Sequence, residues 1–204
     1  MKKQKSQYKK IVLGITGSYG TGKTTVAKIF KSFGAKVIDA DKIAHKLIKP
    51  GTTVYHKIVA IFGSRILKKD KTIDRAKLSE VVFNNHKELE RLNKIVHPAV
   101  IRIIKDELSR TFQKATVLDA PLFFEAGLGH LVDKIIVVTL SRQKQLRRLL
   151  KKTSLSRQDI LKKINAQIPL SDKVRIADFI IDNGGTIAKT KKQVEKLRRI
   201  LWKN

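Results

Sequence analysis

The sequence GSYGTGKTT, residues 17–25, directly follows an apolar run at residues 11–15. Four of its residues fill the pattern G-x-x-x-x-G-K-[ST]: Gly17, Gly22, Lys23 and Thr24. In such a loop, glycines let successive backbone N–H groups turn toward phosphate groups, and the N-terminus of the following helix adds a partial positive charge. Lys23 can reach the β- and γ-phosphates, and the Thr24 hydroxyl can bind Mg²⁺. The stretch therefore predicts a strand, a loop that binds a nucleoside triphosphate, and a helix from about Lys23 to Ser32.

Length and composition are typical of a compact globular protein. The 204 residues, 42% of them apolar, are enough for one domain with a core and an inserted subdomain. No apolar stretch approaches the roughly 18 to 20 residues of a membrane span, and the basic start MKKQKSQYKK lacks the apolar segment of a signal peptide. The absence of cysteine excludes a disulfide framework and thiolate metal sites. We expect a single cytoplasmic domain over residues 1–204, without a membrane partner.

The charge balance is strongly positive, with 45 Lys and Arg residues against 17 Asp and Glu residues and a net charge of +28. Three interpretations compete: a surface that binds nucleic acid, a field that attracts a polyanionic substrate, and a lysine-rich composition on solvated helix faces. The basic residues are spread over nearly every predicted helix, and the aromatic residues, 6% of the chain, show no base-stacking pattern. Charge alone decides nothing, and we expect no nucleic-acid partner.

Five short runs rich in apolar residues predict buried strands: residues 11–16, 35–41, 115–120, 133–140 and 178–182. Continuous apolar strands separated by helical patterns are typical of a parallel sheet covered by helices on both faces. The predicted fold class is therefore α/β, with a five-stranded parallel sheet flanked by helices. About 70 residues between the second and third runs look helical. They are too many for one crossover helix, so we expect a helical subdomain inserted at the edge of the sheet.

Two local signals concern helix ends. Pro98 follows His97 and should end or bend the helix there, because proline lacks an N–H and restricts the residue before it. Ser156 is expected to cap the N-terminus of a helix, with Asp159 as the acid three residues later in a variant of the capping box.

Three aspartates come at the ends of predicted strands. Asp39 and Asp41 lie at the carboxyl end of the second strand, where α/β sheets bind their ligands. A carboxylate there can orient an acceptor hydroxyl and take its proton, although two aspartates at this spacing are also common helix caps. Asp119 ends the third strand and either holds Mg²⁺, like a Walker B carboxylate, or serves only as a capping residue. The residues alone leave these alternatives open.

Six stretches, taken in order, resemble the dephospho-coenzyme A kinase family: TGSYGTGKTT, VIDAD, LNKIVHP, VLDAPLFFE, QLRRL and INAQIPLSDKVRIADFIIDNGG. Many families share the phosphate loop, whereas IDAD, HP, PLFFE and the closing AD-FIIDN-G are more discriminating in combination. The resemblance covers essentially the whole chain from Ile11 onward. It implies a P-loop kinase that uses ATP and Mg²⁺ to phosphorylate the ribose 3′-hydroxyl of dephospho-coenzyme A, the last step of coenzyme A biosynthesis.

The resemblance also implies how the chain is divided into parts. The kinase core would comprise residues of about 10–50 and 115–204, and a helical subdomain of about 51–114 would bind the CoA moiety. A mobile lid would lie at about 147–168. Such a kinase is expected to act as a monomer.

Individual roles follow from the same resemblance. The ATP site would comprise the loop, a lid cation and a residue near the adenine: Gly17, Gly20, Thr21, Gly22, Lys23, Thr24, Thr25, Arg148 and Asn183. Thr24 and Asp119 would bind Mg²⁺. Asp41 would be the base that takes the 3′-hydroxyl proton and would act with Lys23 and Arg148, although Asp39 stays open as the base. The acceptor site would be lined or supported by Asp39, Asp41, His97, Pro121, Leu122 and Glu125.

Other functions compete with this one. Another nucleoside or nucleotide kinase would share the loop and lid but should lack the combination of IDAD and HP. A P-loop ATPase that binds nucleic acid would use the positive charge, and DNA or RNA should stimulate its ATP hydrolysis. A catalytically inactive scaffold is at odds with the intact Lys23, Thr24 and Asp41.

The chain departs from the family in the lid and in the loop. Where the family commonly has arginine, this chain has Lys152, followed by Thr153, and Lys163. Lysine keeps the charge but loses the two-pronged contact of a guanidinium group with phosphate oxygens. Tyr19 replaces a small or aliphatic residue, and its ring should either pack on a phosphate-facing edge or point to solvent.

We predict that Lys152→Arg raises kcat/KM a few-fold, because an arginine would clamp the phosphates more firmly in the transition state. Steady-state kinetics with ATP and dephospho-coenzyme A measures the effect. An unchanged or lower kcat/KM contradicts the idea that lysine weakens the lid.

Overall fold

The structure is a computed structural model that describes residues 10–83, 85–121 and 123–202. The chain forms two compact units. The sheet unit comprises the described residues up to Asp39 and from Arg110 onward, and the helical unit comprises residues 40–109. The chain thus passes between the units at 39/40 and 109/110, whereas the sequence predicts a helical insertion of about 51–114.

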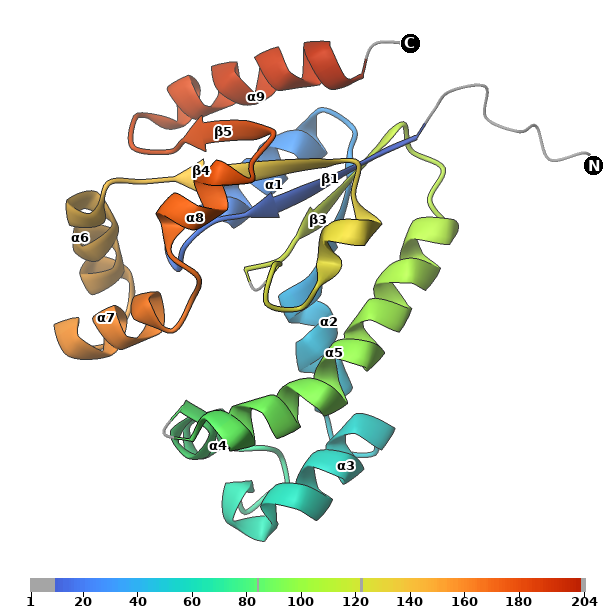
Figure 1. The fold of residues 1–204 in the computed structure, drawn as a ribbon, viewed down its shortest axis with the longest axis vertical. Coiled ribbons are helices and arrows are strands. Elements are labelled where there is room, and N and C mark those ends of the chain that lie inside the picture. Colours follow the sequence, from blue (N-terminus) through green and yellow to red (C-terminus); the bar gives the residue numbers. More distant parts are fainter. Residues whose placement is uncertain (1–9, 84, 122, 203–204) are drawn as a thin grey trace, which may run out of the picture. The chain divides into compact units, whose positions relative to one another are not determined.

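Five parallel strands form the sheet, in the order β2-β3-β1-β4-β5 (Figure 1). Their bounds are Ile11–Thr16 for β1, Lys36–Asp39 for β2, Ala115–Asp119 for β3, Lys134–Thr139 for β4 and Phe179–Asp182 for β5. All pairings between neighbouring strands are parallel. The predicted α/β class with a five-stranded parallel sheet is therefore confirmed. Val and Ile are frequent in these strands because branched side chains pack well on a pleated surface that is buried on both faces.

Helices between and after the strands complete the sheet unit. They are α1 (Lys23–Ser32), α6 (Arg142–Lys152), α7 (Arg157–Asn165), α8 (Leu170–Arg175) and α9 (Ile187–Leu201), with a 3-10 turn at Leu128–Leu131. The predicted bounds of α1 are confirmed. At the start of α7, Ser156 Oγ accepts the N–H of Asp159 at 3.1 Å and donates to its carboxylate at 2.6 Å. This geometry confirms the predicted N-cap.

The two faces of the sheet are covered by different layers. On one face, Leu13 of β1 belongs to a core that includes Phe30 of α1 and Val194 of α9. On the other face, a Cβ at Gly14 would lie 2.6 Å from the ring of Phe123, so the segment after β3 packs directly on the strand. Successive residues of a strand point to opposite faces, which explains why residues 13 and 14 meet different layers.

The segment between β2 and β3 is helical, as predicted, and has a core of its own. Its elements are α2 (Ala40–Leu47), α3 (Thr53–Phe62), α4 (Arg75–Phe83) and α5 (His86–Ser109), with a 3-10 turn at Ser64–Ile66. Ile58, Phe62 and Ile66 are almost completely buried within this unit. The chain enters the helical unit from β2, which is an edge strand of the sheet.

One local prediction needs correction, and another, that Pro98 ends or bends its helix, is narrowed to a bend. The predicted strand at 35–41 ends at Asp39, and Asp41 lies in the first turn of α2. A carboxylate in the first turn interacts favourably with the helix dipole, so this acid supports the start of a helix. Pro98 lies inside α5, which continues to Ser109. Proline removes one backbone hydrogen bond from a helix of 24 residues, and the ribbon of α5 changes direction partway along (Figure 1), so the helix bends rather than ends.

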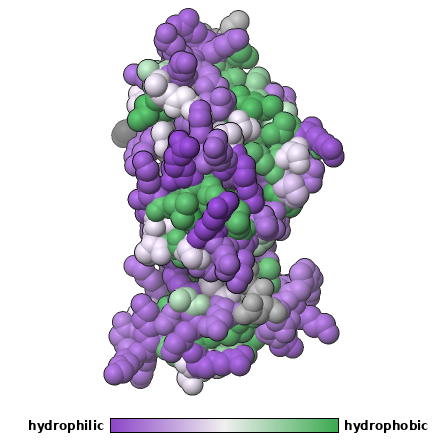
Figure 2. Space-filling model, turned by 90° about the vertical axis from the view of Figure 1, so that its left-hand side faces the viewer, coloured by the Kyte–Doolittle hydropathy of each residue, from purple (hydrophilic) through white to green (hydrophobic). Residues whose placement is uncertain are grey.

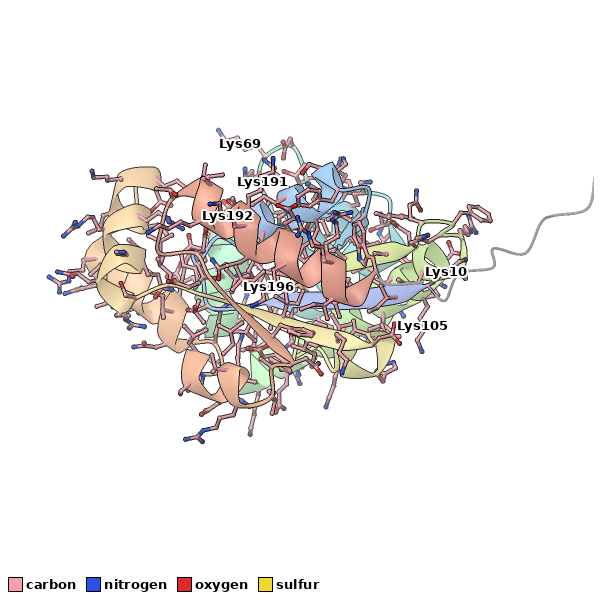
Figure 3. All side chains as sticks on the ribbon, turned by 90° about the horizontal axis from the view of Figure 1, so that it is seen from above. Lys10, Lys69, Lys105, Lys191, Lys192 and Lys196 are labelled. Carbon is pink, nitrogen blue, oxygen red and sulfur yellow. The ribbon has the colours of Figure 1, made fainter. Side chains whose placement is uncertain are left out.

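Exposed lysines project from several elements. Figure 3 labels six of them: Lys10, Lys69, Lys105, Lys191, Lys192 and Lys196. Three lie on α9 and the others on separate segments, so the positive charge is not gathered in one arm. The face drawn in Figure 2 is largely hydrophilic, with smaller hydrophobic areas. Within the described residues, no helix is both long and apolar enough to cross a bilayer.

Asp178, just before β5, joins the last two strands of the sheet. Its carboxylate accepts a hydrogen bond from Lys134 Nζ at 2.7 Å and another from the N–H of Ile135 at 2.8 Å. The Lys134 contact, and then the Ile135 N–H, favour the charged form and hold the pKa of Asp178 below its ordinary value.

Asp178→Asn should therefore lower the free energy of unfolding by about 1 kcal/mol at neutral pH. Because the folded-state pKa is depressed, this contribution is present above the unfolded-state pKa of about 3.9 and is lost as the pH falls through the folded-state pKa. Urea unfolding of both proteins at neutral and progressively lower pH measures the difference between their free energies of unfolding. A difference that stays constant into strong acid contradicts the prediction.

Candidate functional site

The phosphate loop, residues 17–25, has a backbone that only glycine allows at two positions. Gly17 and Gly22 have φ values of +150° and +95°. A Cβ at Gly17 would lie 2.4 Å from the carbonyl oxygen of Val138, and a Cβ at Gly22 would lie 2.0 Å from Asn183 Nδ2. Gly22 is also the N-cap residue of α1 and offers the helix no side-chain cap. The N–H groups of the first turn of α1 can therefore bind an anion, assisted by the helix dipole.

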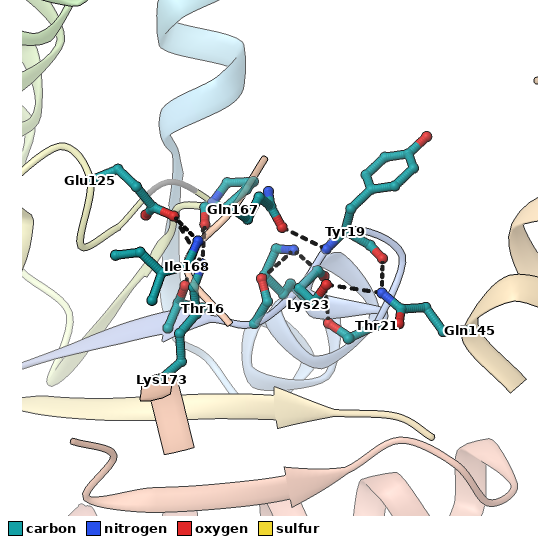
Figure 4. A network of polar contacts seen from close by, with 12 residues as sticks. Thr16, Tyr19, Thr21, Lys23, Glu125, Gln145, Gln167, Ile168 and Lys173 are labelled. Atoms are coloured by element: carbon teal, nitrogen blue, oxygen red, sulfur yellow. Dashed lines mark hydrogen bonds and ion pairs between the residues drawn. The ribbon is translucent and has the colours of Figure 1, made fainter. Parts of the chain in front are cut away.

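Three amide side chains from later in the chain hold the loop. Asn183 Nδ2 donates to the carbonyl oxygen of Thr21 at 2.8 Å. Gln145 Nε2 donates to Ser18 Oγ at 3.0 Å and to the carbonyl oxygen of Tyr19. Gln167 Oε1 accepts the N–H of Tyr19 at 2.8 Å (Figure 4). These contacts fix the shape of the loop.

Lys23 reaches back over the loop from the first residue of α1. Its side chain is 7% exposed, and Nζ donates to the carbonyl oxygens of Gly17 at 3.2 Å and Ser18 at 3.0 Å (Figure 4). Thr24 is exposed at the next position, whereas Thr21 is buried and donates through Oγ1 to the carbonyl oxygen of Ser18. The start of α1 therefore presents the ammonium group of Lys23 and the exposed hydroxyl side chain of Thr24, where a triphosphate and its metal ion are expected.

Arg148 and Asn183 contact each other beside the phosphate loop. Arg148, on α6, donates through Nη2 to the carbonyl oxygen of Asn183 at 3.2 Å. The Asn183 side chain is 5% exposed and also accepts a hydrogen bond from Thr190 Oγ1 at 3.0 Å. Its amide is thus fully engaged with the protein, so the structure gives Asn183 a role in holding the loop. Its predicted position near the adenine stays a prediction.

Two carboxylates meet at the carboxyl edge of the sheet. Asp39 of β2 is in register with Asp119 of β3, which in turn is in register with Ile15 of β1, directly before the loop. Asp119 is 5% exposed, and Asp39 is half-buried. Asp41 follows two residues later as an exposed residue of α2. It belongs to the helical unit, as does His97, which is half-buried in α5.

The predicted acceptor loop, of which the structure describes residues 121 and 123–125, follows β3 and is held from α8. The carbonyl oxygen of Pro121 accepts a hydrogen bond from Lys173 Nζ at 3.3 Å. Glu125 Oε1 lies 3.3 Å from the same Nζ and accepts the N–H of Ile168 at 3.1 Å. Leu122, a predicted acceptor residue, lies outside the described residues. The structure therefore connects two of the predicted acceptor residues through a lysine that no sequence motif had singled out.

The ring of Tyr19 has neither of the two placements that the sequence predicts. Its ring neither faces the phosphate edge nor points freely to solvent, but packs half-buried against an apolar cluster of α6 and α7 that includes Leu149 and Ile160. Lys163 Nζ lies 5.8 Å from the ring centroid, within reach of a cation–π contact. Burial of the apolar ring explains this placement, which links the loop to the predicted lid.

A cavity of about 440 Å³ opens beside Ser18 of the loop. Gln145 and Arg142 of α6 line one side, and the segment 164–170 lines another. The volume is in the range of small-molecule sites. A nucleotide-sized ligand could therefore extend from the loop toward the α7–α8 connection.

The chain is similar to known proteins over most of its length. The family model of dephospho-CoA kinase matches residues 11–189. A dephospho-CoA kinase of Carboxydothermus hydrogenoformans is 41% identical over 197 residues, which cover 95% of this chain and 96% of that protein. The solved dephospho-CoA kinase of Campylobacter jejuni has a TM-score of 0.67 at 33% identity and covers 94% of this chain and 96% of its own. TT1252 from Thermus thermophilus has a TM-score of 0.83 at 29% identity, with 94% and 98% covered.

The contacts of Asn183 generate a prediction for the loop. Asn183→Ala leaves the buried carbonyl oxygen of Thr21 without its side-chain partner and removes one of the two acceptors of the Thr190 hydroxyl, which should cost about 1–3 kcal/mol of stability. Because the loop is then less ordered, ATP should also bind several-fold more weakly. Gln113→Ala, which removes an exposed amide side chain before β3, is the control and should leave ATP affinity unchanged. Calorimetric titration with ATP measures the dissociation constant of each variant. A wild-type dissociation constant in the Asn183 variant contradicts the prediction.

Proposed function

The chain belongs to the dephospho-CoA kinase family, and from that membership we propose how its residues perform the reaction. The activity is transfer of the γ-phosphoryl group of ATP to the 3′-hydroxyl of dephospho-coenzyme A, which completes coenzyme A. The family match over residues 11–189 carries this conclusion. The preformed phosphate loop supports it, because such a loop provides the nucleotide site that the reaction needs.

The phosphate loop is proposed to bind ATP through its backbone and Lys23. Gly17, Gly20, Thr21 and Gly22 would present N–H groups to the β- and γ-phosphates, and Thr24 and Thr25 would continue this contact into the first turn of α1. The ammonium group of Lys23 would exchange its contacts with loop carbonyls for phosphate oxygens. Most of the rate acceleration would then come from positioning and from charge stabilisation, since phosphoryl transfer asks little covalent chemistry of the protein.

Thr24 and Asp119 fit the demands of a magnesium site. Mg²⁺ is usually held by one or two protein oxygens together with phosphates and water. Among the described residues, no group of three or more His, Cys, Asp or Glu forms a cage for a metal. An exposed hydroxyl on α1 and a carboxylate at the end of β3 match this sparse pattern. Bound Mg²⁺ would neutralise charge on the phosphate oxygens.

Asp41 is proposed as the base that orients the 3′-hydroxyl and takes its proton, with Asp39 as its orienting neighbour. Asp41 is exposed at the start of α2 and therefore open to a substrate. Asp39 is half-buried at the strand end and is the alternative base. The acceptor would be further lined or supported by His97, Pro121, Leu122 and Glu125, with the helical unit binding the CoA moiety.

The second half of α6 and all of α7 lie in the segment proposed as the lid, about 147–168. Arg148 of α6 would turn from the carbonyl oxygen of Asn183 toward the ATP phosphates when the lid closes, and Asn183 would lie near the adenine. Closure would exclude water, which otherwise competes as an acceptor. We propose a cytoplasmic monomer that requires neither nucleic acid nor a membrane.

An assay that couples ADP release to NADH oxidation tests the acceptor. Dephospho-coenzyme A should give much faster turnover than any nucleoside or nucleotide in a panel, and DNA or RNA should leave the background ATP hydrolysis unchanged. A nucleoside or nucleotide that reacts as well as dephospho-coenzyme A would identify another kinase. Hydrolysis stimulated by nucleic acid would identify an ATPase of a different class.

Asp41→Asn should lower kcat by at least about a hundredfold, because a positioned base typically contributes that much, while ATP binding survives. Asp39→Asn should lower kcat less. Single-turnover kinetics and ATP titration of both variants separate the two effects. Near-normal turnover in the Asp41 variant would remove Asp41 as the base, and a larger loss in the Asp39 variant would assign that role to Asp39.

A further inference from the structure

Lys173, on α8, is fully buried, and the proposed mechanism gives it no role. Its side chain has 0% relative exposure, although lysine is among the residues most rarely buried in proteins. Its ammonium group lies 3.3 Å from Glu125 Oε1 and donates to the carbonyl oxygen of Pro121 at 3.3 Å. One buried cation therefore holds both ends of the acceptor loop.

Glu125 extends this connection to the phosphate loop. Its Oε1 also accepts the N–H of Ile168 at 3.1 Å. The preceding residue, Gln167, accepts the N–H of Tyr19 at 2.8 Å. Figure 4 shows these hydrogen bonds running from Lys173 through Glu125 and residues 167–168 to the phosphate loop. Two consecutive residues of the α7–α8 connection thus contact the acceptor side and the nucleotide side of the sheet unit.

Stability alone does not explain this ion pair, in which Lys173 is fully buried and the Glu125 side chain is 21% exposed. The loss of hydration of two charges offsets most of their attraction, and apolar side chains of similar size often serve a fold equally well. Glu125 Oε2 adds a further cost, because it is buried and has no hydrogen-bond partner in the part of the chain that the structure describes. Apolar side chains, however, cannot hold the oxygen of Pro121 and the N–H of Ile168 in fixed directions. The pair is therefore suited to positioning.

We propose that Lys173 is a positioning residue for phosphoryl transfer: through Glu125, Ile168 and Gln167, it fixes the acceptor loop relative to the phosphate loop. The inference rests on the proposed function, in which the acceptor loop lines the dephospho-coenzyme A site. In-line transfer requires the acceptor oxygen to meet the phosphorus at close range, and a misplacement of about 1 Å can cost on the order of a hundredfold in rate. Lys173 acts on this alignment and touches neither substrate.

The kinetic test compares Lys173→Met, Glu125→Leu and the double variant. Removal of one partner leaves a buried charge uncompensated and should lower the melting temperature, whereas removal of both should restore most of it. We expect kcat with dephospho-coenzyme A to stay at least about tenfold below wild type in the double variant, while the ATP dissociation constant changes less than about threefold. Arg175→Met, which alters an exposed side chain of the same helix, is the control and should match wild type.

Glu125→Gln and hydrogen exchange separate positioning from folding. The Gln variant keeps an oxygen that can accept the N–H of Ile168, so it should retain more turnover than Glu125→Leu. Amide exchange at Ile168 and in the acceptor loop should be faster in the double variant than in wild type, whether or not substrate is present.

A double variant with wild-type turnover, or with turnover that recovers together with stability, would overturn the inference. If the wild-type chain fails to phosphorylate dephospho-coenzyme A, the proposed function fails instead. In that case the amide exchange of Ile168 in the double variant still tests the role of Lys173. A rate equal to that of wild type would refute the role, and a faster rate would support it.

Discussion

The structure of the nucleotide site depends on hydrogen bonds between the phosphate loop and side chains far along the chain. The glycines give the loop a shape that other residues cannot adopt, but this freedom also makes the unbound loop entropically expensive to order. Asn183, Gln145 and Gln167 compensate by bonding Thr21, Ser18 and Tyr19. The loop is thereby fixed from the β5–α9 turn, from α6 and from the α7–α8 connection. A preorganised loop can bind phosphates without first losing conformational entropy.

The predicted lid, at about 147–168, contacts the phosphate loop mainly through Tyr19. The ring of Tyr19 packs against Leu149 and Ile160 with Lys163 close to its face, and Gln145 of α6, just before the lid, holds the loop backbone. A movement of these helices would therefore be felt directly at the loop backbone.

Much of the fold could be predicted from the sequence because its signals are local. Apolar runs gave the five strands, and the loop pattern gave the bounds of α1. The end of β2 could not be read in this way, since Asp41 suits the first turn of a helix as well as a strand end. Pro98 left open whether its helix ends or bends, because a long helix tolerates one missing hydrogen bond.

Residues of the site that would contact the nucleotide could be predicted from a motif. Residues that only hold other residues in place could not. Lys23 and Thr24 lie in a pattern that names their role. Gln145, Gln167 and Lys173 lie in the stretches QLRRL and INAQIPLSDKVRIADFIIDNGG, but these stretches do not name a role for them. Glutamine and lysine are usually solvent-exposed, and only the folded chain shows that Lys173 is buried against Glu125. Hydrogen bonds between residues more than a hundred positions apart leave no trace in local sequence.

The central claim is that the loop holds a γ-phosphoryl group for an alcohol rather than for water. Incubation with γ-labelled ATP and dephospho-coenzyme A, followed by separation of the products and phosphorus NMR of the labelled coenzyme, tests it most directly. The account predicts that nearly all released label appears as the 3′-phosphate of coenzyme A, with little as inorganic phosphate. Label released mainly as inorganic phosphate, or found at another position of the coenzyme, would contradict it.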